Sequence, residues 1–568
     1  MDMLSFNLRE VPFSRYGSYI AFSWTDGLLM RTIRGGLDST STLLTLALVN
    51  DDHYPVLFDV KATPSHLHLH CEDGFVELVI SDSNRVLVRG RGVRLKLSRE
   101  TGTRQFDNAL SPDGTRWEIN AYDSLSKIGL RAVTGKLEVD AVWNRVRSDS
   151  IVATFTPNQE RYFEGEIQVF DSVWLPEDDV RPFDEEILKV QQHYETWVQS
   201  TLAVHERWNT ARELAAYIMW SCVVEPRGYH QRPAMLMSKN WMNKIWSWDN
   251  CFNALALTTQ NPALAWDQFV TFFDHQDAQG AIPDHLTDST RSFRFYKPPI
   301  HGWALLKLMQ YRDVVDSEKL SQIYKPLCRW TDWWLTYRDD DHDGIPQYNH
   351  GNESGWDNGT VFGEGVPVES PDLSAYLVIQ MDTLSEIATY LGKQDEAEKW
   401  SQRADALCTL LIEHFWNGSQ FVARHANSHQ IISGDSTLVF MPLILGKRLP
   451  EDMRQKLIEN LKRFITANGI ATEQPDSPYY EADGYWRGPI WAPSTYLLVD
   501  GLLVCGEYDL AIEISRRFCE MAARSGMAEN YDALSGDGLR DRAYTWTSSV
   551  FLLLGNLVLH ANQPEPSS

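Results

Sequence analysis

Residues Trp174-Leu-Pro-Glu-Asp-Asp-Val-Arg-Pro-Phe-Asp184 separate two parts of the chain whose residue patterns differ. The proline and acidic content of this stretch is typical of a boundary between domains. The whole chain has 568 residues, which is more than one hydrophobic core usually supports. We therefore predict two domains, one formed by residues 1–183 including the linker and one formed by residues 184–568.

Before the boundary, the pattern is that of β-strands. Segments 75–80 (FVELVI), 85–97 (RVLVRGRGVRLKL) and 136–142 (KLEVDAV) alternate apolar and polar residues or are rich in β-branched residues. Glycine, aspartate and asparagine lie between such segments, as they do in the turns of an antiparallel sheet. This pattern predicts an N-terminal antiparallel β-sandwich.

After the boundary, apolar residues recur at helical spacing. Long loops rich in tryptophan, glycine, aspartate and proline separate the expected helices. This alternation predicts an all-α (α/α)6 barrel, in which loops at one end build the functional site. The segments with helical spacing are 187–203, 206–224, 249–259, 262–276, 299–315, 317–337, 372–391, 394–415, 435–445, 450–465, 489–503, 506–524 and 545–560.

Charge and composition narrow the possible partners. The formal net charge is −25, and a field of that sign repels nucleic acids and anionic membranes. No apolar run reaches the roughly 20 residues of a membrane-spanning helix, and the first residues show no signal-peptide pattern. The seven cysteines form no CxxC pair and do not indicate a disulfide framework. We therefore expect a cytoplasmic protein with no nucleic acid or membrane partner; the oligomeric state stays open.

Two loops carry carboxylates that could do chemistry. The loop 339–360 contains Asp357 directly after Trp356, and the loop 526–538 contains Glu529. Glycoside hydrolysis needs one carboxyl group that protonates the leaving oxygen and another that activates water or attacks carbon. An apolar neighbour or a nearby like charge raises the pKa of such an acid, and Trp356 and Glu353 could supply these effects. Taken alone, a loop aspartate is more often a turn residue or a helix cap.

A series of short motifs follows the boundary in order: Trp246-Ser-Trp-Asp249 with Phe252, Gly280-Ala-Ile-Pro283, Lys297-Pro-Pro-Ile300, Glu353-Ser-Gly-Trp-Asp-Asn358, Tyr485-Trp-Arg-Gly-Pro-Ile-Trp491, Glu529-Asn-Tyr-Asp532 and Tyr544-Thr-Trp-Thr547. Each motif is weak alone, but their order and spacing are specific. With them, residues 184–562 resemble the catalytic domain of glycoside hydrolase family 63 and the related family 37 trehalases. The resemblance covers roughly two thirds of the chain.

The resemblance implies an inverting mechanism in which Asp357 is the general acid and Glu529 is the general base that activates water. No cofactor is required for that chemistry. Asp249 would bind the outer hydroxyls of the released sugar, and Arg487 would orient a carboxylate or a hydroxyl. The substrate-binding residues that it implies are Trp246, Trp248, Asp249, Phe252, Trp356, Tyr485, Trp486, Arg487, Gly488, Trp491 and Trp546.

We therefore predict an exo-acting α-glycosidase, in the first place an α-glucosidase, that acts on a disaccharide or another small soluble glycoside. The alternatives are an α-mannosidase of the mannosylglycerate hydrolase type and a sugar phosphorylase on the same barrel. The intact Glu529 argues against a phosphorylase, in which phosphate replaces the water-activating base. Many relatives continue the acid motif as Asp-Asn-Ser-Pro-Arg, whereas this chain has Asp357-Asn-Gly-Thr-Val, which leaves the leaving group open.

A calcium loop is also indicated. Asp339, Asp341 and Asp343, followed by Gly344, have the opening spacing of an EF-hand. His350 stands where an EF-hand has glutamate, so the full motif is absent. A structural calcium ion on the three aspartates is one expectation, and an ordinary acidic turn is the other.

Overall fold

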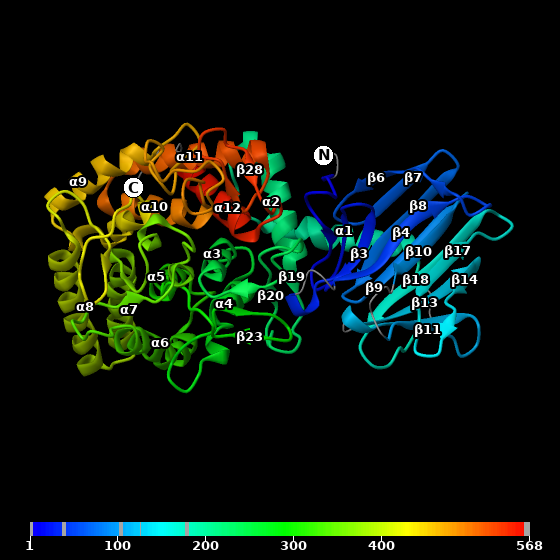
Figure 1. Ribbon diagram of the computed structural model, residues 1–568, viewed down its shortest axis with the longest axis horizontal. Coiled ribbons are helices and arrows are strands. Elements are labelled where there is room, and N and C mark those ends of the chain that lie inside the picture. The colour runs from blue at the N-terminus through cyan, green and yellow to red at the C-terminus, as the bar shows by residue number, and fades with distance from the viewer. Residues whose placement is uncertain (1–3, 37–40, 101–105, 125, 177–180, 562–568) are drawn as a thin grey trace.

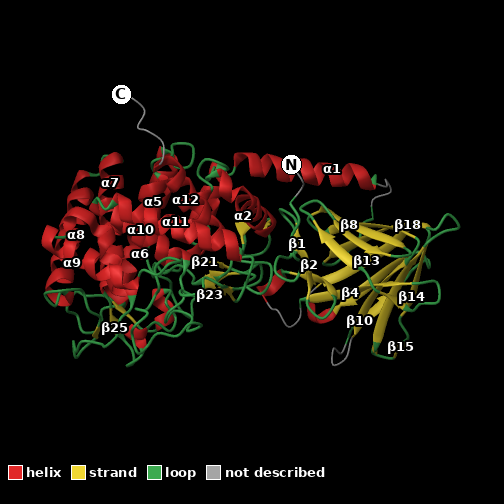
Figure 2. Ribbon diagram, turned by 90° about the horizontal axis from the view of Figure 1, so that it is seen from above, coloured by secondary structure: helices red, strands yellow, loops and turns green. Residues whose placement is uncertain are grey.

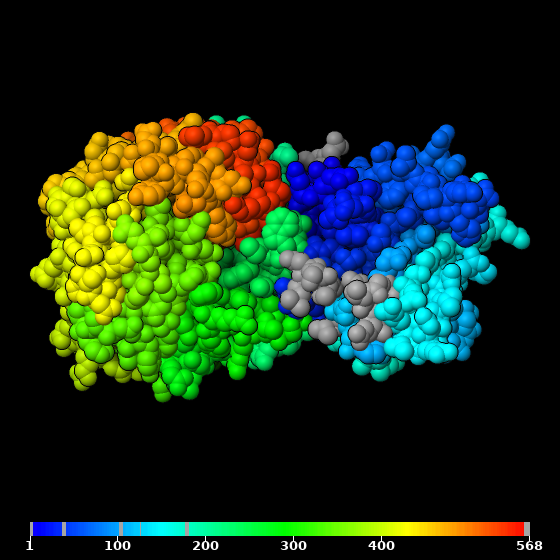
Figure 3. Space-filling model, in the orientation of Figure 1, coloured from blue at the N-terminus to red at the C-terminus, as the bar shows by residue number. Residues whose placement is uncertain are grey.

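The computed structural model describes residues 4–36, 41–100, 106–124, 126–176 and 181–561. It is elongated, with strands at one end and helices at the other (Figure 1). In the space-filling view the two parts meet near the middle of the molecule (Figure 3). Their junction is polar as well as apolar, because Lys239 of the helical part donates to Ser14 Oγ at 3.0 Å and the Arg31 guanidinium donates to the Lys239 carbonyl at 3.1 Å.

The N-terminal part consists of two antiparallel sheets around one hydrophobic core, which confirms the predicted antiparallel β region. Leu46 and Leu95 of the first sheet and Leu78 and Leu130 of the second are all buried in that core. In the first sheet the strands are β1 (Phe13–Ser14), β2 (Ile20–Trp24), β3 (Leu28–Thr32), β4 (Thr42–Val49), β10 (Arg94–Glu100), β17 (Ser150–Thr156) and β14 (Lys136–Asp140), with β5 (Pro55–Val56) beside β4. In the second they are β11 (Asn108–Leu110), β12 (Arg116–Ala121), β13 (Ser126–Thr134), β18 (Tyr162–Phe170), β9 (Arg85–Arg91), β8 (Gly74–Asp82), β7 (Leu67–Cys71) and β6 (Asp59–Ala62).

The C-terminal part is helical, and every segment with helical spacing forms a helix. Its helices are α1 (Phe183–Ser200), α2 (Asn209–Cys222), α3 (Asp249–Ala256), α4 (Pro262–Val270), α5 (His301–Leu308), α6 (Ser317–Tyr337), α7 (Pro371–Tyr390), α8 (Gln394–Phe415), η8 (Thr437–Arg448), α9 (Glu451–Leu461), α10 (Ala492–Cys505), α11 (Tyr508–Ser525) and α12 (Thr545–Ala561). None of the helices in the described part of the chain has the length and apolar character needed to cross a membrane.

One segment differs from an ordinary α-helix. The stretch predicted at 435–445 forms η8, a 3-10 helix that contains Pro442 and a kink at Gly446, where φ is +53°. Proline has no N–H to donate within a helix and its ring crowds the preceding turn, so the α-helical bonding pattern is interrupted there. The linker prediction, 174–184, is described in part: α1 begins at Phe183, and residues 177–180 lie outside the described residues.

The helices are arranged so that their connecting loops gather at one end of the helical part (Figure 2). Short hairpins lie among these loops, including β21 (Ile245–Trp246) with β22 (His285–Leu286), β24 (Gln347–Tyr348) with β25 (Val368–Glu369) and β26 (Arg424–His425), and β27 (Asn530–Tyr531) with β28 (Gly538–Leu539). The motifs singled out in the sequence lie on or next to these hairpins.

Candidate active site

Asp357 lies in a tight loop that packs directly on Trp248. The loop turns at Gly355, where φ is +77° and an added Cβ would come within 2.5 Å of the Trp248 ring. Only glycine combines this left-handed backbone with such a close approach. The Gly-Trp-Asp motif therefore places Asp357 against the Trp246–Asp249 motif, although more than a hundred residues separate them along the chain.

The environment of Asp357 favours its protonated form. Burial raises the pKa of this carboxyl, the Lys297 ammonium at 3.9 Å opposes the shift, and the negative charge of Asp284 raises the pKa further. The expected like charge from Glu353 is thus supplied by Asp284 instead. Glu353 is held by Arg338, whose Nη2 donates at 2.8 Å, and by the Asn349 backbone N–H at 2.8 Å.

Lys297 is a buried cation that lies between two acids. Its Nζ lies 3.7 Å from Asp284 and 3.9 Å from Asp357, and it donates to the Asn352 carbonyl at 2.8 Å. It also lowers the pKa of Asp249, although burial raises that pKa more strongly and leaves it well above the ordinary value. Lys297 therefore compensates negative charge that the buried site could not hold otherwise.

Asp249, the first residue of α3, presents an unused acceptor. It is 4% exposed, and its Oδ2 is buried without a hydrogen-bond partner among the described residues. Nearly all buried polar atoms in proteins are hydrogen-bonded, so an orphaned carboxylate oxygen beside the acid loop indicates a position for a donor such as a sugar hydroxyl.

Glu529 lies at the start of the β27–β28 hairpin and is 2% exposed. Its backbone N–H donates to the Asp541 carbonyl at 2.7 Å, which fixes the hairpin entry. Burial, reinforced by the charge of Asp541, raises the pKa of Glu529 to about 7; the Arg540 guanidinium and a hydrogen bond from Tyr485 act in the opposite direction. A carboxyl group with a pKa near neutrality can take up and release a proton at physiological pH.

Tyr485 lies within the electrostatic influence of both carboxylates. Burial raises the pKa of its hydroxyl, and the negative charges of Glu529 and Asp357 raise it further, so both acids lie near this side chain. The residue has a φ of +63°, a strained conformation for a side chain of this size. Trp491 Nε1 donates to the Tyr485 carbonyl at 2.7 Å, and the Arg540 guanidinium lies 4.8 Å from its ring centre. The surrounding contacts thus hold Tyr485 in one orientation.

Asn358 joins the loops that carry Asp357 and Tyr485. Its Nδ2 donates to the Gly484 carbonyl at 3.0 Å, and its Oδ1 accepts the Trp486 N–H at 3.0 Å. One side chain therefore fixes the acid loop against the Tyr485 loop. The asparagine that follows the acid in the motif consequently has a positioning function.

The aromatic residues of the motifs form one cluster behind the carboxylates. Trp486 and Trp491 stack with ring centres 4.0 Å apart, and Trp356 lies 4.9 Å from Trp486. Trp246 and Tyr485 stay partly exposed. The buried members of the cluster are Trp248, Phe252, Trp356, Trp486, Trp491 and Trp546. Direct contact between these rings and a sugar stays a prediction, because their faces are covered in this structure.

Arg487 and Gly488 of the Tyr485–Trp491 motif have different roles in this structure. Gly488 has a φ of +144°, and a Cβ there would lie 2.2 Å from the Glu481 carbonyl oxygen, so its role in this structure is a close backbone contact. Arg487 is partly exposed and pairs with Glu481 at 2.7 Å. Its Nε is buried and has no partner within the described residues.

Sequence reasoning missed part of this network. Lys297 begins the Lys297–Ile300 motif, but the motif does not predict that its charge lies between two carboxylates. Asp284 directly follows the Gly280–Pro283 motif, and that position is the signal in the sequence that indicates it. Arg540 lies in no motif. Asp341 and Asp343 of the predicted calcium loop lie close together with Glu369 and His429, whereas Asp339 is outside this group and accepts the Gly344 N–H at 3.2 Å.

The similarity to known proteins lies in the helical part of the chain. Residues 242–547 match the family model described as the mannosylglycerate hydrolase MGH1-like glycoside hydrolase domain. Mannosylglycerate hydrolase MGH2 of Selaginella moellendorffii is 22% identical over 388 residues, covering 54% of this chain and 79% of that protein. A mannosylglycerate hydrolase of Thermus thermophilus is 22% identical over 54% of this chain and 93% of its own length. The glucosylglycerate hydrolase of Mycolicibacterium hassiacum is 21% identical over 54% of this chain and 91% of its own length.

Two solved structures of glycoside hydrolases have folds similar to that of this chain. The GH63 mannosylglycerate hydrolase from Thermus thermophilus, in complex with Tris and D-glycerate, aligns with a TM-score of 0.55 at 18% identity, covering 60% of this chain and 99% of its own. A bacterial glucoamylase complexed with acarbose aligns with a TM-score of 0.62 at 11% identity, covering 98% of this chain and 94% of its own. The second match extends over the β part as well as the helices.

Proposed function

Because the chain belongs to the MGH1-like glycoside hydrolases of family 63, an inverting family, we propose that it removes the terminal sugar from a small α-glycoside, with Asp357 as general acid and Glu529 as general base. The observation that supports one site for both groups is Tyr485: the charges of Asp357 and Glu529 both raise the pKa of its hydroxyl, and a hydrogen bond from Tyr485 lowers the pKa of Glu529. The aromatic cluster and Lys297 then serve to hold the acids and balance their charge.

Asp357 suits the acid role. Its pKa is raised by burial, so a larger fraction of the group stays protonated near neutral pH than in water. Its side chain is 31% exposed, which leaves room for a leaving group beside it. Lys297 moderates the shift, so the carboxyl can also give its proton away.

Glu529 suits the base role. As the carboxylate it accepts the Tyr485 hydrogen bond, which fixes its orientation, and with a pKa of about 7 it is basic enough to take a proton from water during attack. Asp249, with its unpartnered oxygen, would bind hydroxyls of the sugar that is released. No metal ion or cofactor enters this mechanism.

The helices of the C-terminal part pack against one another in a closed ring. Along the contacts, α3 packs against α5, α5 against α7, α7 against η8, η8 against α10, α10 against α12, and α12 back against α3. Helices α2, α4, α6, α8, α9 and α11 each pack against a member of this ring. We infer an (α/α)6 barrel over residues 184–568, with the N-terminal β-sandwich of residues 1–183 as a separate domain.

The first substrate candidate is a glycosylglycerate, an α-linked hexose on a short hydroxy acid. This shifts the emphasis from the α-glucosidase that the sequence predicted to the mannosylglycerate-type alternative, because the relatives named above are mannosylglycerate and glucosylglycerate hydrolases. Arg487 is the cation that we expect to bind the substrate carboxylate. Its partner Glu481 is 56% exposed, and such exposed pairs contribute only about 0–1 kcal/mol, so a substrate carboxylate could replace it.

A neutral α-glucoside is the second candidate. Lys297, Arg487 and Arg540 are each already paired with acids of this chain, so each of these cations has an anionic partner without an anionic substrate. With a glycosylglycerate, Arg487 would bind the substrate carboxylate; with a neutral glucoside, it would stay paired with Glu481. Kinetics of an Arg487 variant distinguish the two candidates.

We expect the highest kcat/KM on α-mannosylglycerate or α-glucosylglycerate in a panel that also contains trehalose, maltose and aryl α-glycosides. Arg487→Gln should raise KM for the glycerate substrates roughly 10–100-fold, the worth of a charge-assisted hydrogen bond, and leave the aryl glycosides nearly unchanged. Arg516→Gln is the matched control, because Arg516 pairs with Glu513 on the outside of α11. Equal loss on neutral and anionic substrates would support the neutral candidate, and activity that requires phosphate would contradict hydrolysis.

A further inference from the structure

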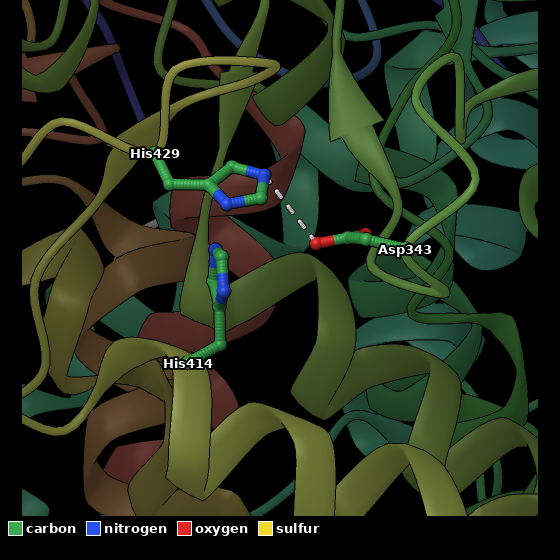
Figure 4. Close-up of side chains that lie close together, drawn as sticks. All are labelled: Asp343, His414 and His429. Atoms are coloured by element: carbon green, nitrogen blue, oxygen red, sulfur yellow. Dashed lines mark ion pairs between the residues drawn. The ribbon is translucent and has the colours of Figure 1, made fainter.

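Four side chains from three separate segments converge next to β24, and none of them is one of the proposed catalytic carboxylates. Asp341 and Asp343 lie in the loop after α6, Glu369 lies on β25, and His429 lies in the loop after β26. Figure 4 shows His429 directed at Asp343, with His414 of α8 below it. One oxygen or nitrogen atom from each of the four lies within 4.8 Å of those of the others.

The distances within this cluster are those of ligands around one small cation. His429 Nε2 lies 3.0 Å from Asp341 Oδ2, 3.5 Å from Asp343 Oδ2 and 3.7 Å from Glu369 Oε1. Ligand atoms at roughly 2.0–2.2 Å from a tetrahedral ion are about 3.3–3.6 Å apart. The side chains would therefore need to move little to bind such an ion.

Glu369 indicates that a positive charge belongs in the cluster. Its side chain is fully buried, at 0% exposure, and its Oε1 faces His429 without a hydrogen-bond partner among the residues described. Burying a carboxylate oxygen without a partner is costly. Three acids share the two imidazoles of His414 and His429, and a divalent cation would add positive charge and give the Glu369 Oε1 atom a partner.

His414 supports the cluster from below. Its Nε2 lies 2.6 Å from Glu369 Oε2, the oxygen that faces away from His429, and the two imidazole rings are 4.9 Å apart and edge-on. A hydrogen bond to the far oxygen of a carboxylate fixes its orientation toward an ion, as is common around protein metal sites. His429 itself is 40% exposed, which gives an ion a path of entry.

We propose that Asp341, Asp343, Glu369 and His429 bind a divalent transition-metal ion of the zinc type. An imidazole nitrogen favours such an ion over calcium, which prefers six to eight oxygen ligands, and the glutamate that closes a calcium loop is absent at His350. The ion joins the loop after α6, β25 and the loop after β26. Strand β24 connects the loop of Asp341 and Asp343 with the loop that carries Asp357. The ion would therefore stabilise the start of the Asp357 loop. The proposal is independent of the substrate.

Zinc binding by the full-length protein tests this proposal. After dialysis against a chelator, isothermal titration with ZnCl2 should give one equivalent bound, at least about tenfold more tightly than CaCl2, and zinc should raise Tm. His429→Ala should lower zinc affinity by more than the roughly 10–100-fold that loss of a supporting residue costs. His414→Ala should fall within that 10–100-fold range.

His425→Ala is the matched control, because His425 lies on β26 close to His429 but faces the exposed Glu364 at 3.7 Å; its zinc affinity should be unchanged. X-ray absorption of the zinc-loaded wild type should show four nitrogen or oxygen ligands and the outer-shell scattering of one imidazole, a readout that does not depend on the variants folding. Absence of zinc binding, binding of calcium as tight as that of zinc, or zinc affinity that survives His429→Ala would each overturn the proposal.

Discussion

Glu529→Gln should lower kcat on every substrate by about 10²–10⁴-fold, the usual worth of a general base. Glutamine keeps the size of the side chain and can still accept the Tyr485 hydrogen bond, but it cannot take a proton from water. The loss should therefore be the same for good and poor leaving groups, because water must be activated whatever departs. Steady-state rates on a natural glycoside and on a glycosyl fluoride measure both cases.

The same substitution should stabilise the protein above neutral pH. The pKa of Glu529 is raised to about 7 in the folded state, against about 4.3 in an unfolded chain. The stability gained from the protonated group is thus complete below pH 4 and is lost as the pH rises through 7. At pH 8 the buried charge costs up to about 3 kcal/mol, which glutamine avoids. Unfolding at pH 8 and at pH 4 should show a gain in Tm only at the higher pH.

Asp532→Asn is the matched control for Glu529. Asp532 is the nearest acid along the chain, but its Oδ1 accepts the Leu534 N–H at 2.7 Å and the Ser535 N–H at 3.1 Å, which is a turn-stabilising role. It should retain most of the activity. Loss of only a few fold in a folded Glu529→Gln, with a large loss in Asp532→Asn, would reverse the assignment.

Asp357→Asn should give a loss that depends on the leaving group. An unactivated glycoside needs its departing oxygen protonated, so its kcat should fall by about 10²–10⁴-fold. A glycosyl fluoride or a nitrophenyl glycoside needs little protonation and should keep far more of its rate. The ratio of the two losses is the signature of the acid, and no covalent intermediate should accumulate in an inverting enzyme.

Glu353→Gln and Asp249→Asn separate Asp357 from the other acids nearby. Glu353 is held by Arg338 and the Asn349 N–H, so its substitution should lower stability without changing the ratio between leaving groups. Asp249→Asn should weaken binding of the sugar and affect all leaving groups alike. A loss that depends on the leaving group in either variant, and not in Asp357→Asn, would contradict the role of Asp357.

Most of the fold could be predicted because local pattern and tertiary structure agree. Alternation in segments such as 75–80 produces strands whose apolar residues enter one core, and the helical spacing after residue 184 produces helices. The stretch 435–445 departs from the prediction because Pro442 and Gly446 change its hydrogen bonding without changing its apolar pattern. A periodicity of apolar residues reports burial, and it does not distinguish an α-helix from a 3-10 helix.

The site could be predicted only where a short motif carries it. Asp357 and Glu529 stand in recognisable motifs, but the side chains that set their pKa values come from elsewhere in the chain. Lys297, Asp284 and Arg540 reach the acids through tertiary packing, and so does His429 beside the aspartate loop. The spacing of that loop suggested Asp339 as a ligand because the partners on β25 and after β26 cannot be seen from spacing.

The stereochemistry of the first product is the most direct test of the central claim, that Glu529 directs water at the sugar while Asp357 protonates the leaving group. Proton NMR recorded during the first turnovers of an α-glycoside separates the two anomers before they equilibrate in water. Direct attack by water opposite the leaving group gives the β-anomer first, and this is the result we expect. Early release of the α-anomer, or release of a sugar phosphate that depends on added phosphate, would contradict the account.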